Sequence, residues 1–288
     1  MPENHFTSLK NILQLALFED IPEIDITSTY IIPENPVVHT KIITRERGIF
    51  FGKQIITTLM HMVSQDYQVT VFFEDGDLIQ ENDVIAVIQA PAHDILKAER
   101  ILLNFIQHLS GISTLTQLYV KTLSDPNIHV MDTRKTSPGL RFLEKAAVAA
   151  GGGYNHRHSL SDMVLIKENH LYCLEESGKK NELHWRIKEF KEKNPAIKVE
   201  VEVETCDDLL TLDLRDADYI LFDNFSIPNL HRGLKICDEK KYNAKKEVSG
   251  NITLENIHQY KGLNIHRISV GRLTHSAKAL NFSLLLEK

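Results

Sequence analysis

The second half of the chain repeats one pattern, a short apolar run followed at once by charged, polar or glycine residues. Helix-like segments separate six such runs, which lie at residues 128–131, 163–166, 197–203 and 219–222, around Val248, and at 268–270. Strands that alternate with helices form parallel sheets. The pattern therefore predicts an α/β fold, either an open, irregular barrel of about six parallel strands or a flat, doubly wound sheet. In such barrels, chemistry belongs at the carboxyl ends of the strands.

The first half of the chain mixes the two hydrophobic periods, which favours an α/β sandwich. Its expected elements are a helix at 6–19, a strand at 37–52, a helix at 54–63, strands at 68–73 and 84–88, and a helical stretch at 95–122 that breaks around Ser110-Gly111. We place a domain boundary near that break, with one domain at residues 1–112 and the barrel at 113–273.

Composition excludes several classes of protein. The 288 residues carry a net charge of −6, whereas broad nucleic-acid binding needs a basic excess. No apolar run approaches the roughly 20 residues that span a bilayer, and the polar N-terminus does not resemble a signal peptide. Three distant cysteines, Cys173, Cys206 and Cys237, predict neither a disulfide framework nor a zinc site. We expect a cytoplasmic protein.

Positive charge is nevertheless concentrated in one segment. Residues 134–167 hold Arg134, Lys135, Arg141, Lys145, Arg157 and Lys167, opposed only by Glu144 and Asp162. Arginine offers a planar fork that matches a carboxylate or phosphate, and lysine offers a compact charge. For an isolated Arg-Lys pair, a solvated basic turn is the simpler interpretation. The whole cluster predicts a site for a small anion.

Glycines and histidines follow in the segment GGGYNHRHSLSD at 151–162. The glycines permit close backbone approach or a positive φ, although a flexible loop is the default interpretation. They do not form the dinucleotide-binding fingerprint. His156 and His158 do not predict a metal site, because no third histidine lies at ligand spacing and the surroundings are basic.

Acids occupy the next two strand ends. In IKVEVEVET, the valines alternate with Glu200, Glu202 and Glu204, so the glutamates share one face of the strand. Asp223 ends the following run. Such acids can bind sugar hydroxyls, hold Mg²⁺ or stabilise positive charge on a ribose carbon. Small residues at the last two strand ends, 249–251 and 271–276, suggest a phosphate pocket built from backbone N–H groups.

These motifs together resemble the quinolinate phosphoribosyltransferase family. The matching stretches span nearly the whole chain: EDIPEIDITS, RERGIFFG, AERILLNFIQHLSGIST, DTRKTSPGLR, GGGYNHR, LSDMVLIKENH, VEVET, LFDNF, VSGNI and SVGRLTHS. Arg272 and Ser113 depart from the usual family residues. The resemblance implies a sandwich domain beside an open barrel, joined by a C-terminal helix at 274–288. It also implies a homodimer or a larger homo-oligomer.

The resemblance further implies the reaction. Phosphoribosyl pyrophosphate and quinolinate would give nicotinate mononucleotide, pyrophosphate and CO₂, with Mg²⁺ and no organic cofactor. Quinolinate would bind to Arg134, His156, Arg157 and the neighbouring subunit's Arg100, and Lys135 and Lys167 would contact phosphates. Glu202 and Asp223 would bind ribose hydroxyls and Mg²⁺, and the ribose phosphate would bind at Ser249, Gly250, Asn251, Gly271 and His275. The alternatives are a paralogue acting on another small acid and a non-catalytic phosphometabolite-binding protein.

Overall fold

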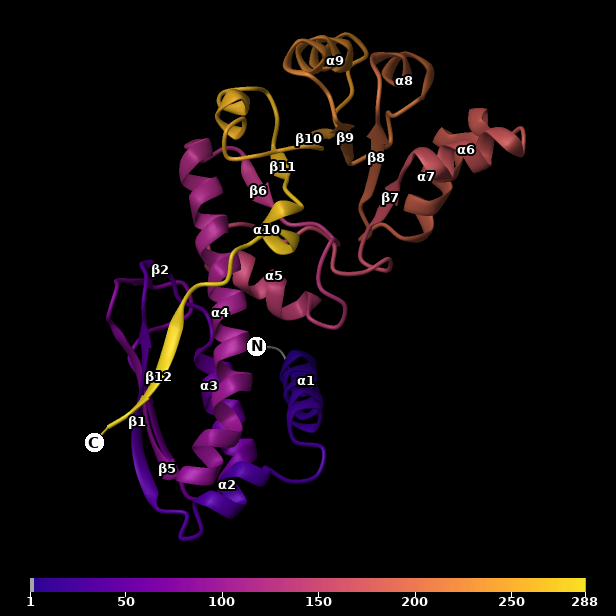
Figure 1. Cartoon of the computed structure of the whole chain (residues 1–288). Helices are drawn as coiled ribbons and strands as arrows, with labels where there is room; N and C mark the ends of the chain where they lie inside the picture. Colours follow the sequence, from indigo (N-terminus) through magenta and orange to yellow (C-terminus); the bar gives the residue numbers. More distant parts are fainter. Residues whose placement is uncertain (1–2, 288) are drawn as a thin grey trace. The chain divides into compact units, whose positions relative to one another are not determined.

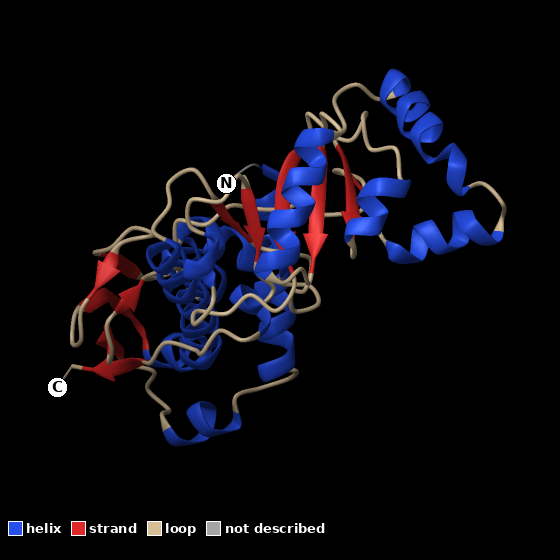
Figure 2. Cartoon of the chain, turned by 90° about the horizontal axis from the view of Figure 1, so that it is seen from above, coloured by secondary structure: helices blue, strands red, loops and turns tan. Residues whose placement is uncertain are grey.

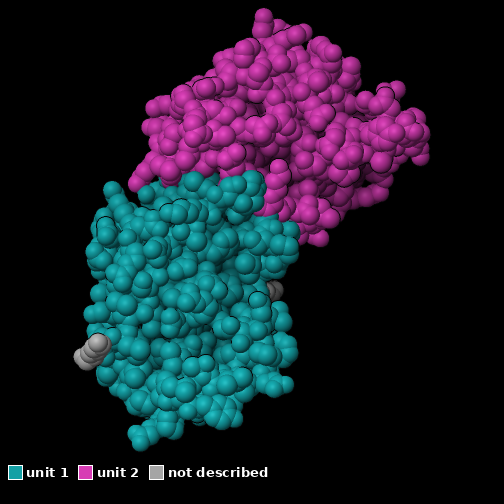
Figure 3. Space-filling model, in the orientation of Figure 1, with its two compact units in different colours: residues 1–117, 136–152, 273–288 teal, residues 118–135, 153–272 magenta. Residues whose placement is uncertain are grey.

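The computed structural model describes residues 3–287 and divides the chain into two compact units (Figure 3). Unit 1 comprises residues 1–117, 136–152 and 273–288, and unit 2 comprises residues 118–135 and 153–272. Both units mix helices and strands, which confirms the α/β fold. Within the described residues, no helix combines the length and the apolar character that a membrane crossing requires.

Unit 1 is built on a four-stranded sheet in the order β12-β1-β5-β3, with antiparallel pairing throughout. Figure 1 shows these strands with helices of the same unit beside them. The strands are β1 (Val37–Thr44), β3 (Gln68–Val71), β5 (Val84–Pro91) and β12 (Phe282–Leu286), and β2 (Gly48–Ile49) pairs with β4 (Leu78–Ile79). The helices are α1 (Glu3–Asp20), α2 (Ile26–Ile31), α3 (Lys53–Val63), α5 (Arg141–Ala150) and the first part of α4 (Ala92–Leu123).

The C-terminal segment is a strand, so the helix expected at 274–288 is wrong for the residues that the structure describes, which end at 287. A short helix, α10 (Arg272–His275), is followed by β12, which pairs antiparallel with β1 from Thr40↔Leu286 to Thr44↔Phe282. The edge of β1 supplies backbone hydrogen-bond partners for this segment, and a local stretch of sequence gives no sign of them.

The break expected around Ser110-Gly111 is also wrong, because α4 runs without interruption from Ala92 to Leu123. Both residues serve contacts within unit 1 instead. Ser110 Oγ accepts a hydrogen bond from Phe51 N at 3.0 Å. A Cβ on Gly111 would lie 2.2 Å from the carbonyl oxygen of Lys278, so only glycine permits this approach. Tertiary packing here outweighs the low helix propensity of glycine.

Unit 2 is built on a six-stranded parallel sheet in the order β6-β11-β10-β9-β8-β7, with β6 and β7 at the edges. Helices and strands of the chain are distinguished by colour in Figure 2. The strands are β6 (His129–Met131), β7 (Val164–Ile166), β8 (Val199–Val203), β9 (Tyr219–Asp223), β10 (Lys245–Ser249) and β11 (Arg267–Ser269). The intervening helices are α6 (Glu168–Glu176), α7 (Leu183–Lys193), α8 (Cys206–Thr211) and α9 (Ile227–Glu239), with short 3₁₀ turns at Lys180–Glu182 and Ile257–Tyr260.

The glycine triplet begins where α5 ends, and its first residue packs against α4. A Cβ on Gly151 would lie 2.3 Å from the carbonyl oxygen of Ser113 on α4, and Gly152 has a φ of +86°. Ser113 Oγ also donates to the Ala147 carbonyl at 2.8 Å. The close approach that glycine allows is therefore between two helices of unit 1.

Candidate functional site

Parallel pairing brings the predicted site residues of unit 2 to one edge of its sheet. Lys167 follows β7, Glu202 lies near the end of β8, and Asp223 ends β9. Arg134 and Lys135 follow β6, whereas Ser249 ends β10 and Gly271 follows β11. The carboxyl ends of parallel strands share an edge, which is where α/β proteins hold their ligands.

Lys167 and Glu202 form the central ion pair of this edge. Ile166 pairs with Val201, so the next residues on each strand lie side by side, and Lys167 Nζ is 2.5 Å from Glu202 Oε2. Burial raises the pKa of Glu202 to about 7, although Lys167 opposes the rise and the charge of Asp223 adds to it. A carboxyl group with this pKa can exchange a proton near neutral pH.

The three glutamates of β8 differ in position. Glu200 and Glu202 are buried on the same face, as the alternation predicts, whereas Glu204 is exposed. Of the three, Glu202 forms the ion pair with Lys167, whereas Glu200 contacts the buried His156. The geometry thus favours Glu202 as the glutamate at the strand ends.

Arg134 and Arg157 supply paired positive charge. Burial and the nearby charge of Arg134 lower the pKa of Arg157, whose Nη1 donates to the Met163 carbonyl at 3.0 Å. Arg134 Nε is buried and makes no hydrogen bond within residues 3–287. A buried donor without a partner is costly, so this guanidinium is suited to receive an anion.

His156 belongs to a buried ion network beneath these residues. Its Nε2 lies 3.0 Å from Glu200 Oε2 and 3.5 Å from Glu247 Oε1, and only 8% of the residue is exposed. Burial alone would lower the pKa of His156, but hydrogen bonds to the two carboxylates and their charges outweigh it and raise the pKa to about 9. Its expected contact with substrate remains a prediction.

His156, Glu200 and Glu247 have the residue types and the spacing of a metal site, since their ligand atoms lie within 4.8 Å of one another. Arg267 already occupies this position. Its Nη2 lies 2.9 Å from Glu200 Oε1. Its Nε lies 2.5 Å from Glu247 Oε2, an ion pair whose angles do not meet the geometry of a hydrogen bond. Two cations therefore balance two carboxylates, and a metal ion would have to displace Arg267.

The segment after β10 forms a tight turn beside Asp223. Asp223 pairs with Ser249 in register, Gly250 has a φ of +93°, and Asn251 has a φ of +51°. This turn presents main-chain groups at the edge that holds the acids. Arg272, one of the two departures from the family pattern, is exposed at the start of α10.

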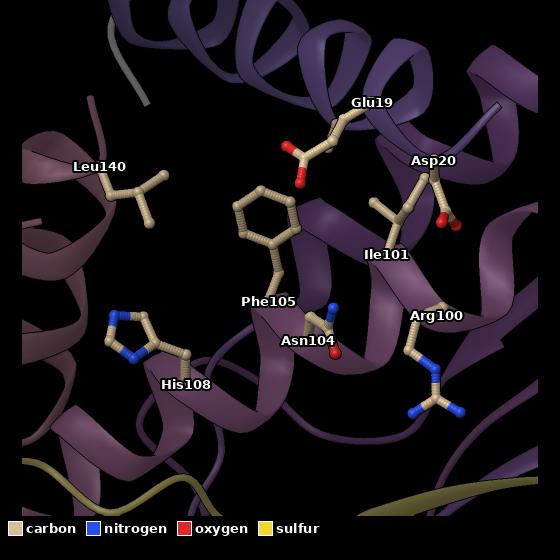
Figure 4. Close-up of a pocket in the computed structure, with 9 residues that line it drawn as sticks. Glu19, Asp20, Arg100, Ile101, Asn104, Phe105, His108 and Leu140 are labelled. Carbon is tan, nitrogen blue, oxygen red and sulfur yellow. The ribbon is translucent and has the colours of Figure 1, made fainter. Parts of the chain in front are cut away.

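Two other predicted site residues, Arg100 and His275, belong to unit 1. Arg100, Asn104 and His108 follow one another at intervals of four residues, and Figure 4 shows them along α4. They line a pocket of about 280 Å³ with Glu19, Asp20 and Leu140 among its other walls. His108 Nε2 lies 2.8 Å from the fully buried Glu144.

Two site-edge contacts were missed at the sequence level. Asp132 Oδ1 accepts a hydrogen bond from His156 N at 2.8 Å, which holds the segment that carries Arg157. Glu168 forms a side-chain hydrogen bond with Glu202, which lowers the pKa of Glu168. Asp132 directly follows the end of β6, and Glu168 directly follows the predicted site residue Lys167. These positions in the sequence could have indicated that both acids belong to the site.

Comparison with known proteins identifies the family. The family model "Quinolinate phosphoribosyl transferase, N-terminal domain" matches residues 25–110, and the corresponding C-terminal domain model matches residues 112–285. The chain belongs to the quinolinate phosphoribosyltransferase family. A probable nicotinate-nucleotide pyrophosphorylase (carboxylating) of Bacillus subtilis is 39% identical to this chain over 285 residues, which cover 98% of this chain and 94% of the relative.

Other members of the quinolinate phosphoribosyltransferase family agree in sequence and in structure. The nicotinate-nucleotide pyrophosphorylase (carboxylating) of Mycobacterium leprae is 33% identical, with 97% of each chain covered. The crystal structure of NadC from Streptococcus pyogenes has a TM-score of 0.88 and 33% identity, with 98% of each chain covered. The family resemblance expected from the motifs is therefore confirmed.

Proposed function

We propose that this chain transfers the phosphoribosyl group of phosphoribosyl pyrophosphate to quinolinate and decarboxylates the product. Nicotinate mononucleotide, pyrophosphate and CO₂ would result. Family membership supports this reaction, and relatives that cover nearly the whole chain carry its name. The observation that carries the proposal for this chain is the buried, unpartnered Nε of Arg134, close to the charge of Arg157 and at the edge that holds Glu202 and Asp223.

Paired arginines suit a dicarboxylate. Arg134 and Arg157 would each meet a carboxylate of quinolinate, and His156 would support them from below. Lys135 and Lys167 would contact the phosphates. Bringing two polyanions together is opposed by about 4 kcal/mol for each like-charge pair at ~4 Å and an effective dielectric constant of about 20. The fixed cations offset this repulsion, which is the main task of the site.

The acids act on the ribose. As pyrophosphate leaves, positive charge develops on the ribose carbon, and the carboxylates of Glu202 and Asp223 would stabilise it while binding the hydroxyls. The ring nitrogen of quinolinate attacks that carbon. The resulting pyridinium withdraws electrons from the adjacent ring carbon, so the carboxylate there leaves as CO₂ and the carbon takes up a proton. The substrate ring itself accepts the electron pair, and no organic cofactor is required.

Mg²⁺ fits the same two acids. Glu202 and Asp223 present carboxylate oxygens, the ligands that Mg²⁺ prefers, and the charge of Asp223 raises the pKa of Glu202, so a cation between them would be favoured. The metal would neutralise charge on the pyrophosphate group. Ser249, Gly250, Asn251 and Gly271 would hold the ribose phosphate at the neighbouring strand ends, with His275 near it.

We also propose that the active form is a homodimer or a larger homo-oligomer, in which Arg100 of one subunit completes the site of its neighbour. Arg100 lines a pocket with Asn104 and His108, so it belongs to a polar face of α4 and not to a core. A cytoplasmic location is part of the same proposal. A domain boundary at residues 112–113 remains a proposal: the N-terminal family model ends at residue 110 and the C-terminal one begins at 112, whereas the two compact units assign residues 113–117 and 136–152 to unit 1.

The proposal is tested by incubating the purified protein with quinolinate, phosphoribosyl pyrophosphate and Mg²⁺ and measuring nicotinate mononucleotide by chromatography. Product is expected at a rate proportional to enzyme concentration. Nicotinate in place of quinolinate distinguishes a paralogue, because one carboxylate leaves an arginine unpaired. Protein that binds phosphoribosyl pyrophosphate in calorimetry but never releases pyrophosphate would be a binding protein and not a transferase.

A further inference from the structure

Asn224 joins the acid at the end of β9 to the turn after β10. Its Nδ2 donates a hydrogen bond to Asp223 Oδ2 at 2.7 Å, and its Oδ1 accepts one from Asn251 Nδ2 at 2.9 Å. Its backbone N donates to the Ser249 carbonyl at 2.9 Å. One residue thus contacts both the carboxylate that we assign to the ribose hydroxyls and the turn that we assign to the ribose phosphate.

The backbone around Asn224 is shaped to make this contact. Asn224 has a φ of +55°, in the left-handed region that asparagine adopts more readily than most residues other than glycine. A Cβ on Gly250 would lie 2.3 Å from Asn224 Oδ1 and 2.6 Å from Asn224 N. Asn224 therefore leaves no room for a side chain at position 250, so this position requires glycine.

A purely structural role explains these contacts poorly. Asn224 is exposed and its partner Asp223 is half-buried, and a hydrogen bond so open to solvent adds little to stability. The amide does constrain Asp223, since a carboxylate with one oxygen held by Nδ2 presents its other oxygen in a fixed direction. Asn256 extends the same chain of contacts, with its Nδ2 donating to the Asn251 carbonyl at 2.9 Å.

We propose that Asn224 is a positioning residue for the phosphoribosyl half of the site: it aims Asp223 at a ribose hydroxyl and sets the distance from that acid to the phosphate-binding turn. The inference rests on the proposed function. It assigns Asn224 to one substrate only, because both hydrogen bonds of its side chain, to Asp223 and from Asn251, lie on the ribose and phosphate side. Loss of Asn224 should therefore affect phosphoribosyl pyrophosphate and spare quinolinate.

Steady-state kinetics of three variants test this. Asn224→Asp keeps the acceptor for Asn251 but replaces the donor to Asp223 with a carboxylate, whereas Asn224→Gly removes both arms and retains a left-handed backbone without strain. Asn251→Ala removes only the arm to the turn. Both Asn224 variants should lose about 10- to 100-fold in kcat/KM for phosphoribosyl pyrophosphate, as for a lost hydrogen bond to a charged group. KM for quinolinate should stay within about twofold of wild type.

Asn82→Asp is the matched control. Asn82 is also an exposed asparagine with a positive φ, +70°, and it lies in unit 1 outside the proposed site. Its variant should keep wild-type kinetics. Binding of ribose 5-phosphate, measured by calorimetry, gives a readout independent of turnover and should weaken in Asn224→Asp and Asn224→Gly but not in Asn82→Asp.

Each outcome decides a different claim. Asn224 variants with wild-type kinetics and wild-type affinity for ribose 5-phosphate overturn the positioning role. Equal losses for both substrates together with a lowered melting temperature in Asn224→Gly overturn it as well, because they indicate a structural role. Wild-type protein that forms no nicotinate mononucleotide refutes the proposed function itself, whatever the variants do.

Discussion

The raised pKa of Glu202 predicts how activity depends on pH. In the proposed mechanism Glu202 must be ionised to stabilise the ribose carbon, and burial raises its pKa to about 7 against the opposing charge of Lys167. The ionised fraction is then ~10% at pH 6 and ~90% at pH 8, so kcat/KM, which reports the free enzyme, should rise roughly tenfold between these values. The value of kcat/KM rises with pH because the carboxyl group of Glu202 is active in its charged form.

Glu202→Gln is the perturbation that isolates this group. The amide has nearly the same shape and does not titrate, so the variant should lose about 10²- to 10³-fold in kcat/KM at pH 8, as for one preorganised charge-stabilising group. Its profile between pH 6 and 8 should lose the tenfold rise. Substrate phosphates also titrate near pH 6, but they do so equally with both enzymes. A rise that stays tenfold in Glu202→Gln would refute the assignment of the pH dependence to this carboxyl group.

Three further outcomes are expected. Arg134→Ala should lower kcat/KM by roughly 10²–10³-fold while Arg232→Ala, on the exposed face of α9, does not, and near-wild-type kinetics would count against Arg134 as a substrate ligand. Mixing inactive Arg100→Ala and Lys167→Ala proteins should restore part of the activity if subunits share a site, whereas none in verified mixed oligomers argues against sharing. The pKa of His156 lies at about 9, above the ordinary 6.5, so its ion pairs contribute about 3 kcal/mol of stability that is present below pH 6.5 and lost as pH rises through 9. The difference in unfolding free energy between wild type and His156→Gln, from urea titrations, should shrink accordingly from pH 6 to pH 10, and a constant difference would contradict the network.

The strand ends of unit 2 could be predicted because parallel topology converts a sequence pattern into a location. Each apolar run is short and its polar end comes at once, so Lys167, Glu202 and Asp223 had to share an edge once the strands were parallel. The alternation in β8 likewise placed Glu200 and Glu202 on the same face, and both are buried. Local periodicity and topology were sufficient for these residues.

The ion network could not be predicted because its partners come from distant strands. Glu247 and Arg267 are charged, so the hydrophobic pattern of the sequence gives no sign of their burial. The pairing of β10 with β11 sets them opposite each other, beside His156. Charged residues that are buried on a parallel sheet resemble loop residues in a local sequence window. Glu247 is buried and Arg267 is mostly buried because each lies beside an oppositely charged residue from another strand, and the sequence alone does not predict these contacts.

The same limit explains the two wrong elements. Gly111 signals a helix break locally, but close contact with the Lys278 carbonyl makes glycine a requirement of packing. The C-terminal segment carries a run of leucines that fits a helix or a strand, and the edge of β1 decides for a strand. In both cases a contact distant in sequence outweighed local propensity.

Release of CO₂ from quinolinate labelled at the 2-carboxylate tests the central claim most directly, because it requires both polyanions to bind at the one edge that holds Arg134, Arg157, Lys167, Glu202 and Asp223. We expect one CO₂ for each pyrophosphate released, with phosphoribosyl pyrophosphate essential and nicotinate a poor acceptor. Pyrophosphate release without CO₂, or equal use of nicotinate, would contradict a site built for a dicarboxylate.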